Sequence, residues 1–122
     1  MIAGLSGSGK SDLALRMIDR GAVLVSDDYT ILTRVGGELH ASAPSSIRGR
    51  IEMRGVGLIE MPFVESVPVR MIVTLDEPAP RFPEVREERV ILEIAIPVVP
   101  LAPFEASAPI KLERALAALM RQ

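Results

Sequence analysis

The sequence predicts an α/β fold: one domain over residues 1–122, with a mixed β-sheet, a helix near the start and a helix at the C-terminal end. Three observations predict it. A glycine-rich loop leads directly into a helical pattern, short apolar runs alternate with turn residues, and a second helical pattern ends the chain. The 122 residues are 48% hydrophobic, which is enough apolar content for one core.

The composition argues against several classes of protein. The 14 Lys and Arg against 16 Asp and Glu give a net charge of −2, without the basic excess of a non-specific nucleic-acid or anionic-membrane binder. Cysteine is absent from the sequence, which excludes a disulfide framework or a thiolate metal site and favours a reducing compartment. Since no apolar run reaches the ~18 residues of a membrane span, we expect a cytoplasmic protein without nucleic-acid or membrane partners.

The first dozen residues carry the most specific motif. The letters GLSGSGKS match the phosphate-binding pattern G-x-x-x-x-G-K-[ST] at every position. The glycines allow backbone N–H groups to turn toward phosphate oxygens at the start of a helix. The lysine can reach the β- and γ-phosphates, and the final serine can ligate a bridging magnesium. The predicted nucleotide-binding residues are Gly4, Leu5, Ser6, Gly7, Ser8, Gly9, Lys10 and Ser11.

A helix is predicted over residues 11–20, and Gly21 ends it. Its apolar face consists of Leu13, Ala14, Met17 and Ile18. Such a loop normally follows a buried strand, but only residues 1–3 precede it, which is shorter than the usual strand. We therefore expect the first strand of the domain to be missing from this chain.

Two adjacent acids follow a short apolar run. Residues 22–25 predict a buried strand that ends in Asp27 and Asp28. An acid at the end of a strand beside a phosphate loop can hold magnesium, position water or take a proton from the attacking hydroxyl. Two such acids can also simply end a strand in a turn. The functional interpretation is favoured, because a helical crossover brings consecutive parallel strands side by side.

Residues 29–34 and 39–42 predict a β-hairpin around a turn that contains two glycines. His40 is the one histidine of the sequence. It alternates with apolar neighbours, so we expect it on the solvated face of the hairpin rather than in a catalytic role.

Residues 51–61 contain a second candidate site. Their apolar residues alternate with Glu52 and Arg54, which places the acid and the base on one face of a strand. The following Gly55 and Gly57 allow the backbone to bend or to approach a ligand closely. A carboxylate near a nucleotide loop suits magnesium. An ordinary Glu–Arg surface pair explains the same pattern equally well, and the residues alone leave both interpretations open.

The second half of the chain predicts two buried strands, 69–75 and 90–96, with a surface excursion over 76–89 between them. Residues 97–104 are expected to be extended because of their prolines. Ser107 is then the predicted cap of the C-terminal helix. The predicted buried stripe of that helix is Leu112, Ala115, Leu116, Leu119 and Met120.

Taken together, the loop with its helix, residues 25–28 and residues 51–57 resemble the catalytic domain of HPr kinase/phosphorylase. Enzymes of that family phosphorylate a serine of the phosphocarrier HPr with ATP, and remove the phosphate by phosphorolysis. Residues 103–112 are similar to the short alphaproteobacterial form, which lacks the family's N-terminal domain. The resemblance implies a single P-loop kinase domain of phosphoenolpyruvate carboxykinase-like topology, with ATP and Mg²⁺ as cofactors and an HPr-like protein as partner.

The resemblance also implies a role for each candidate residue. Lys10 would bind the phosphates, while Ser11 and Glu52 would hold magnesium. Asp28 would be the acid/base that accepts the proton of the attacking serine. Asp27 would support the metal or orient Asp28, and Arg54 lies in the segment that both reactions of the family need.

Two other functions stay open at this point. A small-molecule kinase would need a lid rich in arginines, and residues 44–54 and 81–89 contain such clusters. A nucleotide-binding regulatory module would bind ATP with little turnover. We also expect a homo-oligomer, because longer members of the family are hexamers and an uncovered sheet edge favours association.

Overall fold

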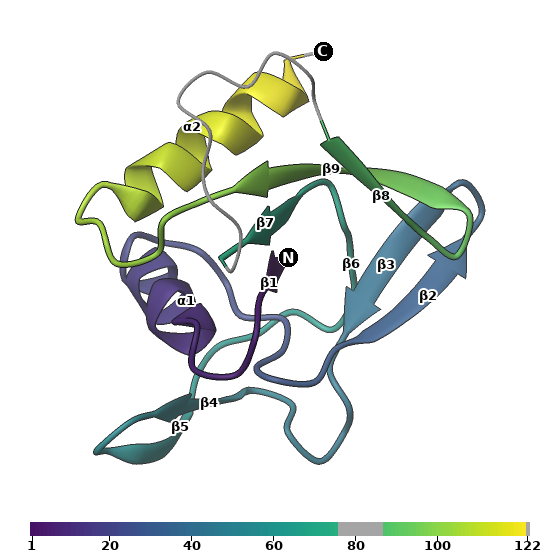
Figure 1. The fold of residues 1–122 in the computed structure, drawn as a ribbon. Coiled ribbons are helices and arrows are strands. Elements are labelled where there is room, and N and C mark those ends of the chain that lie inside the picture. Colours follow the sequence, from purple (N-terminus) through teal and green to yellow (C-terminus); the bar gives the residue numbers. More distant parts are fainter. Residues whose placement is uncertain (76–86, 122) are drawn as a thin grey trace.

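The computed structural model describes residues 1–75 and 87–121, which form two helices and three sheets (Figure 1). The largest sheet has the strand order β1-β7-β9-β8. Its β1 and β9 run parallel to β7, whereas β8 runs antiparallel to β9, so the predicted mixed sheet is confirmed. The strands of this sheet are β1 (Ile2–Ala3), β7 (Ile72–Thr74), β8 (Glu87–Ile91) and β9 (Ile94–Pro100).

Two smaller antiparallel sheets complete the fold. One has the order β2-β3-β6, and the other is the hairpin of β4 and β5. Their strands are β2 (Ile31–Val35), β3 (Glu38–Ser42), β4 (Arg50–Met53), β5 (Gly57–Glu60) and β6 (Val67–Pro68). The predicted hairpin around the glycine turn is confirmed as β2 and β3, and His40 lies on its half-buried side while Leu39 and Ala41 are buried.

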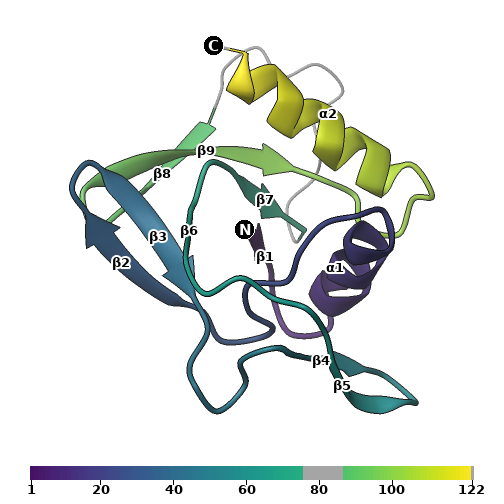
Figure 2. The same cartoon turned by 180° about the vertical axis from the view of Figure 1, so that it is seen from behind.

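The two helices are α1 (Lys10–Asp19) and α2 (Ala108–Met120). They pack on one face of the large sheet, where Leu13 of α1 and Val73 of β7 are buried in the same cluster. The hairpin of β2 and β3 packs on the other face, against Ile72 of β7. Side chains that follow one another along β7 point to opposite faces of the sheet, so the fold has three layers: the helices, the large sheet and the β2–β3 hairpin. Figure 2 shows from behind that the helices and the hairpin lie on opposite sides of the large sheet.

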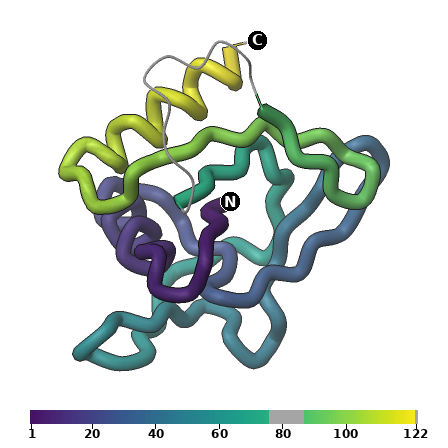
Figure 3. Tube along the Cα trace, viewed as in Figure 1, coloured from purple at the N-terminus to yellow at the C-terminus, as the bar shows by residue number. Residues whose placement is uncertain are grey.

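The chain trace shows the N-terminus near the middle of the view, where β1 lies beside β7 (Figure 3). Residues 2 and 3 form β1 and pair with β7, so a short strand does precede the glycine-rich loop. The expectation of a missing longer strand stays a prediction. Of the residues described, neither helix has the length and apolar character needed to cross a membrane.

The predicted strand over 22–25 is wrong. Within the described residues, only Leu24 of that run has a strand partner, which is Phe63 through an isolated parallel bridge. Val23 is 54% exposed, and β1 pairs with β7 instead. An apolar run forms a strand only if several of its backbone groups can hydrogen-bond to a neighbouring strand. This run pairs with a neighbouring segment at one position, Leu24.

The predicted single strand over 90–96 is also wrong. Leu92 and Glu93 adopt φ angles of 50° and 68°, and the chain reverses there between β8 and β9. A two-residue hairpin loop of this kind needs positive φ at both central positions, which normally calls for Asn or Gly. Of the segment 97–104 that was predicted to be extended, residues 97–100 are extended within β9, whereas residues 103 and 104 lie in a turn. A surface loop was predicted over residues 76–89. Residues 76–86 lie outside the described residues, and residues 87–89 belong to β8.

The C-terminal helix is confirmed, with Ser107 at its N-cap position and Pro109 in its first turn. The Ser107 side chain forms no capping hydrogen bond. Four predicted residues of the buried stripe pack on the core, namely Leu112, Ala115, Leu116 and Leu119. The fifth, Met120, is 63% exposed because it belongs to the last turn of the helix, beyond that cluster.

Candidate active site

The glycine-rich loop (residues 4–11) connects β1 to α1. Its backbone turns through positive φ angles of 81° at Gly7 and 98° at Gly9, and Gly9 is the N-cap of the helix. Only glycine adopts such angles freely. A Cβ atom on Gly4 would lie 2.5 Å from the Ser8 hydroxyl, so the start of the loop also has no room for a side chain. The loop is therefore tightly turned, and its last N–H groups open at the positive end of a helix.

Lys10 and Ser11 begin α1 and are both half-buried. The Lys10 ammonium donates a hydrogen bond to the carbonyl of Gly4 at 2.7 Å, which draws the two ends of the loop together. The Ser11 hydroxyl donates to Asp27 Oδ1 at 2.9 Å. The two side chains that the sequence predicts for phosphate and magnesium thus sit on the first turn of the helix.

Asp27 lies between the loop and the β4–β5 hairpin. Its Oδ2 accepts a hydrogen bond from the backbone N–H of Glu52 at 3.0 Å, while its Oδ1 accepts from Ser11. One carboxylate therefore joins the start of α1 to β4. Asp27 does reach the loop, as predicted, but this contact replaces the strand pairing that the prediction assumed.

Asp28 is exposed beside Asp27 and has a φ angle of 50°. The Tyr29 N–H donates to the carbonyl of Asp27 at 2.5 Å, which closes a tight turn around Asp28. Positive φ is uncommon outside glycine, although Asp tolerates it better than most residues. The Asp28 side chain therefore lies at the surface rather than in the core.

Glu52 and Arg54 are both exposed, but the structure separates them. Glu52 belongs to β4 and faces Leu58 of β5, whereas Arg54 lies in the turn after β4 ends. The prediction that both project from one strand face is therefore wrong, because the chain already reverses at Gly55, where φ is 82°. The predicted bend at the glycines is confirmed.

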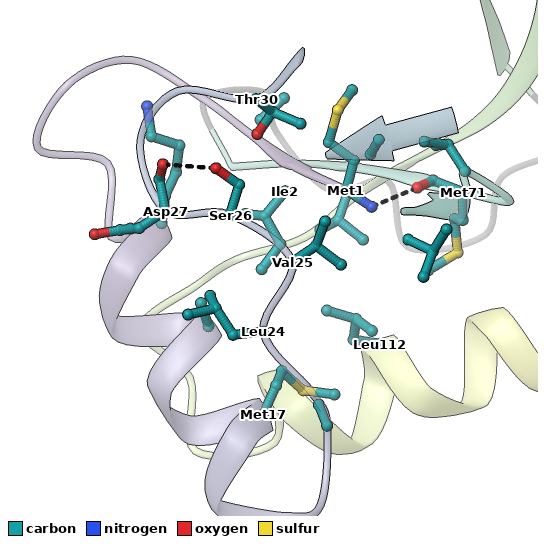
Figure 4. A pocket seen from close by; sticks show the side chains of 18 of the residues that line it. Met1, Ile2, Met17, Leu24, Val25, Ser26, Asp27, Thr30, Met71 and Leu112 are labelled. Carbon is teal, nitrogen blue, oxygen red and sulfur yellow. Dashed lines mark hydrogen bonds between the residues drawn. The ribbon is translucent and has the colours of Figure 1, made fainter. Parts of the chain in front are cut away.

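A cleft of about 810 Å³ opens beside these residues (Figure 4). Lys10, Ser11 and Asp27 line its polar end. The remainder is mostly apolar, with Ile2, Met17, Leu24, Met71 and Leu112 among the side chains around it. The N-terminal amine lies in this apolar part, where it donates to the Met71 carbonyl at 2.8 Å and burial lowers its pKa.

The oxygens of Ser11 and Asp27 suit magnesium. Both are hard donors, and they converge next to the loop that would bind phosphate. In the part of the chain that the structure describes, no group of three or more His, Asp or Glu side chains could hold a metal by itself. Magnesium is usually bound through one or two protein ligands together with waters and substrate phosphates, so this donor set fits it.

The loop has a second neighbour that sequence reasoning missed. The ring of Phe104 lies against Gly9, and the Arg16 guanidinium donates to the carbonyls of Pro103 and Glu105 on either side of it. No local pattern could reveal this contact, because it joins the start of α1 to the segment after β9.

Comparison with known proteins places the chain in a family. The family model described as the HPr serine kinase C-terminal domain matches residues 1–103. The chain belongs to this family. Its predicted resemblance is thereby confirmed.

Individual relatives agree. Over 62 residues the chain is 45% identical to the HPr kinase/phosphorylase of Alkaliphilus metalliredigens and 47% identical to that of Nitrosomonas europaea. Each alignment covers 50% of this chain, but 20% and 19% of the respective relatives. The chain thus spans about a fifth of the length of the curated relatives it matches.

A solved structure extends the likeness to nearly the whole domain. The Hpr(Ser) kinase/phosphatase from Coxiella burnetii matches 98% of this chain and 85% of its own, with a TM-score of 0.81 at 27% identity. The mixed α/β architecture with two helices is therefore the architecture of this family. The phosphoenolpyruvate carboxykinase-like topology stays a prediction.

Proposed function

We propose that this domain is an ATP- and magnesium-dependent kinase that phosphorylates a serine of an HPr-type phosphocarrier. The observation that carries the proposal is the Asp27 carboxylate, which contacts both Ser11 on the glycine-rich loop and the backbone of Glu52. It brings the predicted phosphate, metal and acid residues to one place in a chain of the HPr serine kinase family. Its curated relatives are named HPr kinase/phosphorylase, which supports the same reaction.

The glycine-rich loop would bind the phosphates of ATP. Its positive-φ turns and the first N–H groups of α1 form a concave surface for an anion. Lys10 is bonded to the Gly4 carbonyl at 2.7 Å, and a phosphate oxygen would take over one of its donated hydrogen bonds. The ammonium carries three donors, so it can hold the loop and a phosphate together.

Ser11 and Asp27 would hold the magnesium ion, and the exposed carboxylate of Glu52 would be a further oxygen ligand. The ion supplies charge neutralisation at the phosphates during transfer. Asp27 and Ser11 already hold each other in position, so their oxygens need little rearrangement to bind it.

Asp28 would be the general base. Its exposed position allows the serine hydroxyl of a protein substrate to approach, and the carboxylate would accept the hydroxyl proton as the phosphoryl group is transferred. In the reverse reaction the same group would help inorganic phosphate attack phosphoserine. Arg54, exposed at the tip of the β4–β5 hairpin, would meet the charge of the phosphate or of the substrate.

The test is incubation of the protein with Mg-ATP and HPr-type carriers, followed by mass spectrometry for phosphoserine. Lys10→Ala should weaken ATP binding, whereas Asp28→Asn should leave binding intact and abolish transfer. Asp19→Asn, which alters an exposed acid at the other end of α1, is the matched control and should retain activity.

Three outcomes decide the proposal. Phosphoserine that disappears in Asp28→Asn supports it. ATP binding without phosphoserine on any carrier would contradict it and favour a regulatory module. Equal loss of ATP binding in Lys10→Ala and Asp28→Asn would contradict the assigned roles.

A further inference from the structure

Phe104 is an exposed aromatic residue of the segment between β9 and α2, and its ring lies against the glycine-rich loop where α1 begins. Its side chain is 76% exposed, the highest fraction among the large apolar residues that the structure describes. A Cβ atom on Gly9 would lie 3.1 and 3.2 Å from the ring atoms Cε1 and Cζ. The ring therefore touches the glycine-rich loop along one edge, while most of its surface faces solvent.

The backbone around this ring is anchored. Arg16 of α1 donates hydrogen bonds to the carbonyl of Pro103 and, at 3.3 Å, to that of Glu105. Asp12 in turn holds the Arg16 guanidinium at 3.1 Å. The Glu105 carboxylate pairs with Lys111 of α2, and this contact lowers the pKa of Glu105. An exposed ring whose two flanking residues are both fixed is pre-organised for a contact.

Phe104 and Asp27 contact different residues where the loop joins α1. Asp27 contacts Ser11, whereas Phe104 contacts Gly9. The γ-phosphate and its magnesium would lie at Ser11 and Asp27, so the nucleoside end of the nucleotide would lie elsewhere along the loop. Phe104 offers that end an exposed aromatic ring in contact with the loop.

We propose that Phe104 is the stacking surface for the base of the nucleotide whose phosphates the loop binds. This inference rests on the proposed function, because it requires a nucleotide in the loop. Stacking uses the π-face that every base has, so it contributes affinity without selecting among bases. The domain should consequently bind Mg-ATP and Mg-GTP with similar affinity, and both more tightly than Mg-tripolyphosphate.

Calorimetric titration of the whole chain with these three ligands tests the inference. Removing one base-stacking aromatic weakens binding by about 5-fold to 150-fold, so Phe104→Leu should lose that much affinity for ATP and none for tripolyphosphate. Phe104→Trp should retain ATP affinity. Since the natural sequence has no Trp, the fluorescence of this single indole should be quenched by ATP and unaffected by tripolyphosphate.

Tyr29→Ala is the matched control, because Tyr29 is also aromatic, is 71% exposed and follows the acids on the other side of the loop. It should leave the ratio of ATP to tripolyphosphate affinity unchanged. Equal ATP affinity in Phe104→Leu and the natural protein, or loss in Tyr29→Ala instead, would overturn the stacking role while leaving phosphate binding intact. If the natural protein bound neither ATP nor tripolyphosphate, the proposed function would fail together with this inference.

Discussion

Asp27 accepts a hydrogen bond from the Ser11 hydroxyl at 2.9 Å, and this contact fixes the first turn of α1 to the segment that follows it in the chain. The second oxygen of the same carboxylate accepts from the Glu52 N–H, so the β4–β5 hairpin is held at the same point. A half-buried carboxylate that accepts two hydrogen bonds in this way has a structural role even without a ligand. We propose that the Asp27 carboxylate also binds magnesium, in addition to this structural role.

Replacing Asp27 by Asn should expose this double role. The amide oxygen should stay on the Glu52 N–H, because an NH₂ group there would put a donor against a donor, so the NH₂ group faces the Ser11 hydroxyl, which must turn from donor to acceptor. Both hydrogen bonds lose their charged acceptor, and the free energy of unfolding should fall by about 1 kcal/mol. Thermal unfolding with and without Mg-ATP measures the effect, and the nucleotide should stabilise the variant less than it stabilises the natural protein.

Asp19→Asn, at the end of α1 away from Ser11, is the control for the loss of one negative charge. It should leave both the melting temperature and the stabilisation by Mg-ATP unchanged. An Asp27→Asn protein that matched this control in both measurements would show that the negative charge of Asp27 contributes neither to the Ser11 and Glu52 contacts nor to the binding of Mg-ATP.

The two positive-φ glycines of the loop allow a matched comparison. Gly7→Ala places a methyl group in open space, since no heavy atom lies within 4 Å of the added Cβ. Its cost is therefore the left-handed backbone alone, about 1–2 kcal/mol. Gly9→Ala has the same backbone cost, because φ is 98° there, and its added Cβ atom would also lie too close to the Phe104 ring. We expect a lower melting temperature for Gly9→Ala than for Gly7→Ala, and equal melting temperatures would show that the ring moves away freely.

Leu13 is the residue of α1 that anchors the helix to the core. It is fully buried against the cluster that includes Val73 and Ala108. Leu13→Ala should lower the free energy of unfolding by about 2–5 kcal/mol, because the cavity would adjoin both helices. Ile110→Ala, at a position of α2 that is 49% exposed, is the control and should change it by about 0.5 kcal/mol or less. Denaturant unfolding of the two variants gives both values.

The sequence could predict those parts of the fold that depend on neighbouring residues. The loop, the helix after it, the β2–β3 hairpin and the C-terminal helix each have their own turn or capping residues, and each forms where expected. The strand over 22–25 could not be judged in this way, because a strand depends on a partner and Phe63 is far away in the sequence. The reversal at Leu92 and Glu93 was missed because neither residue is a usual turn former.

In the candidate site, too, the features that depend on neighbouring residues could be predicted, and those that depend on distant segments could not. Glycines at positive φ and a following Lys and Ser are local features, and the sequence is enough to recognise them. The position of Asp27 was expected near the loop, but its bond to the Glu52 backbone depends on how the β4–β5 hairpin packs. The contact of Phe104 with Gly9 joins distant segments and carries no sequence signal.

The ion pair between Arg20 and Glu113 links the end of α1 to α2 and should make stability depend on pH. Arg20 donates a hydrogen bond to Glu113, which lowers the pKa of that carboxyl below its ordinary value of 4.5 and raises the pKa of Arg20.

A carboxyl whose pKa is lower in the folded state contributes stability above its unfolded pKa, and this stability is lost as the pH falls through the folded value. Both side chains are exposed, so the contribution should be small. Glu113→Gln should therefore lower the melting temperature slightly at neutral pH, and the difference from the natural protein should vanish in acid, as the pH falls through the lowered pKa of Glu113. Glu60→Gln, at an exposed position of β5, is the control, and a deficit of Glu113→Gln that persisted in acid would mean that packing rather than charge holds the two helices together there.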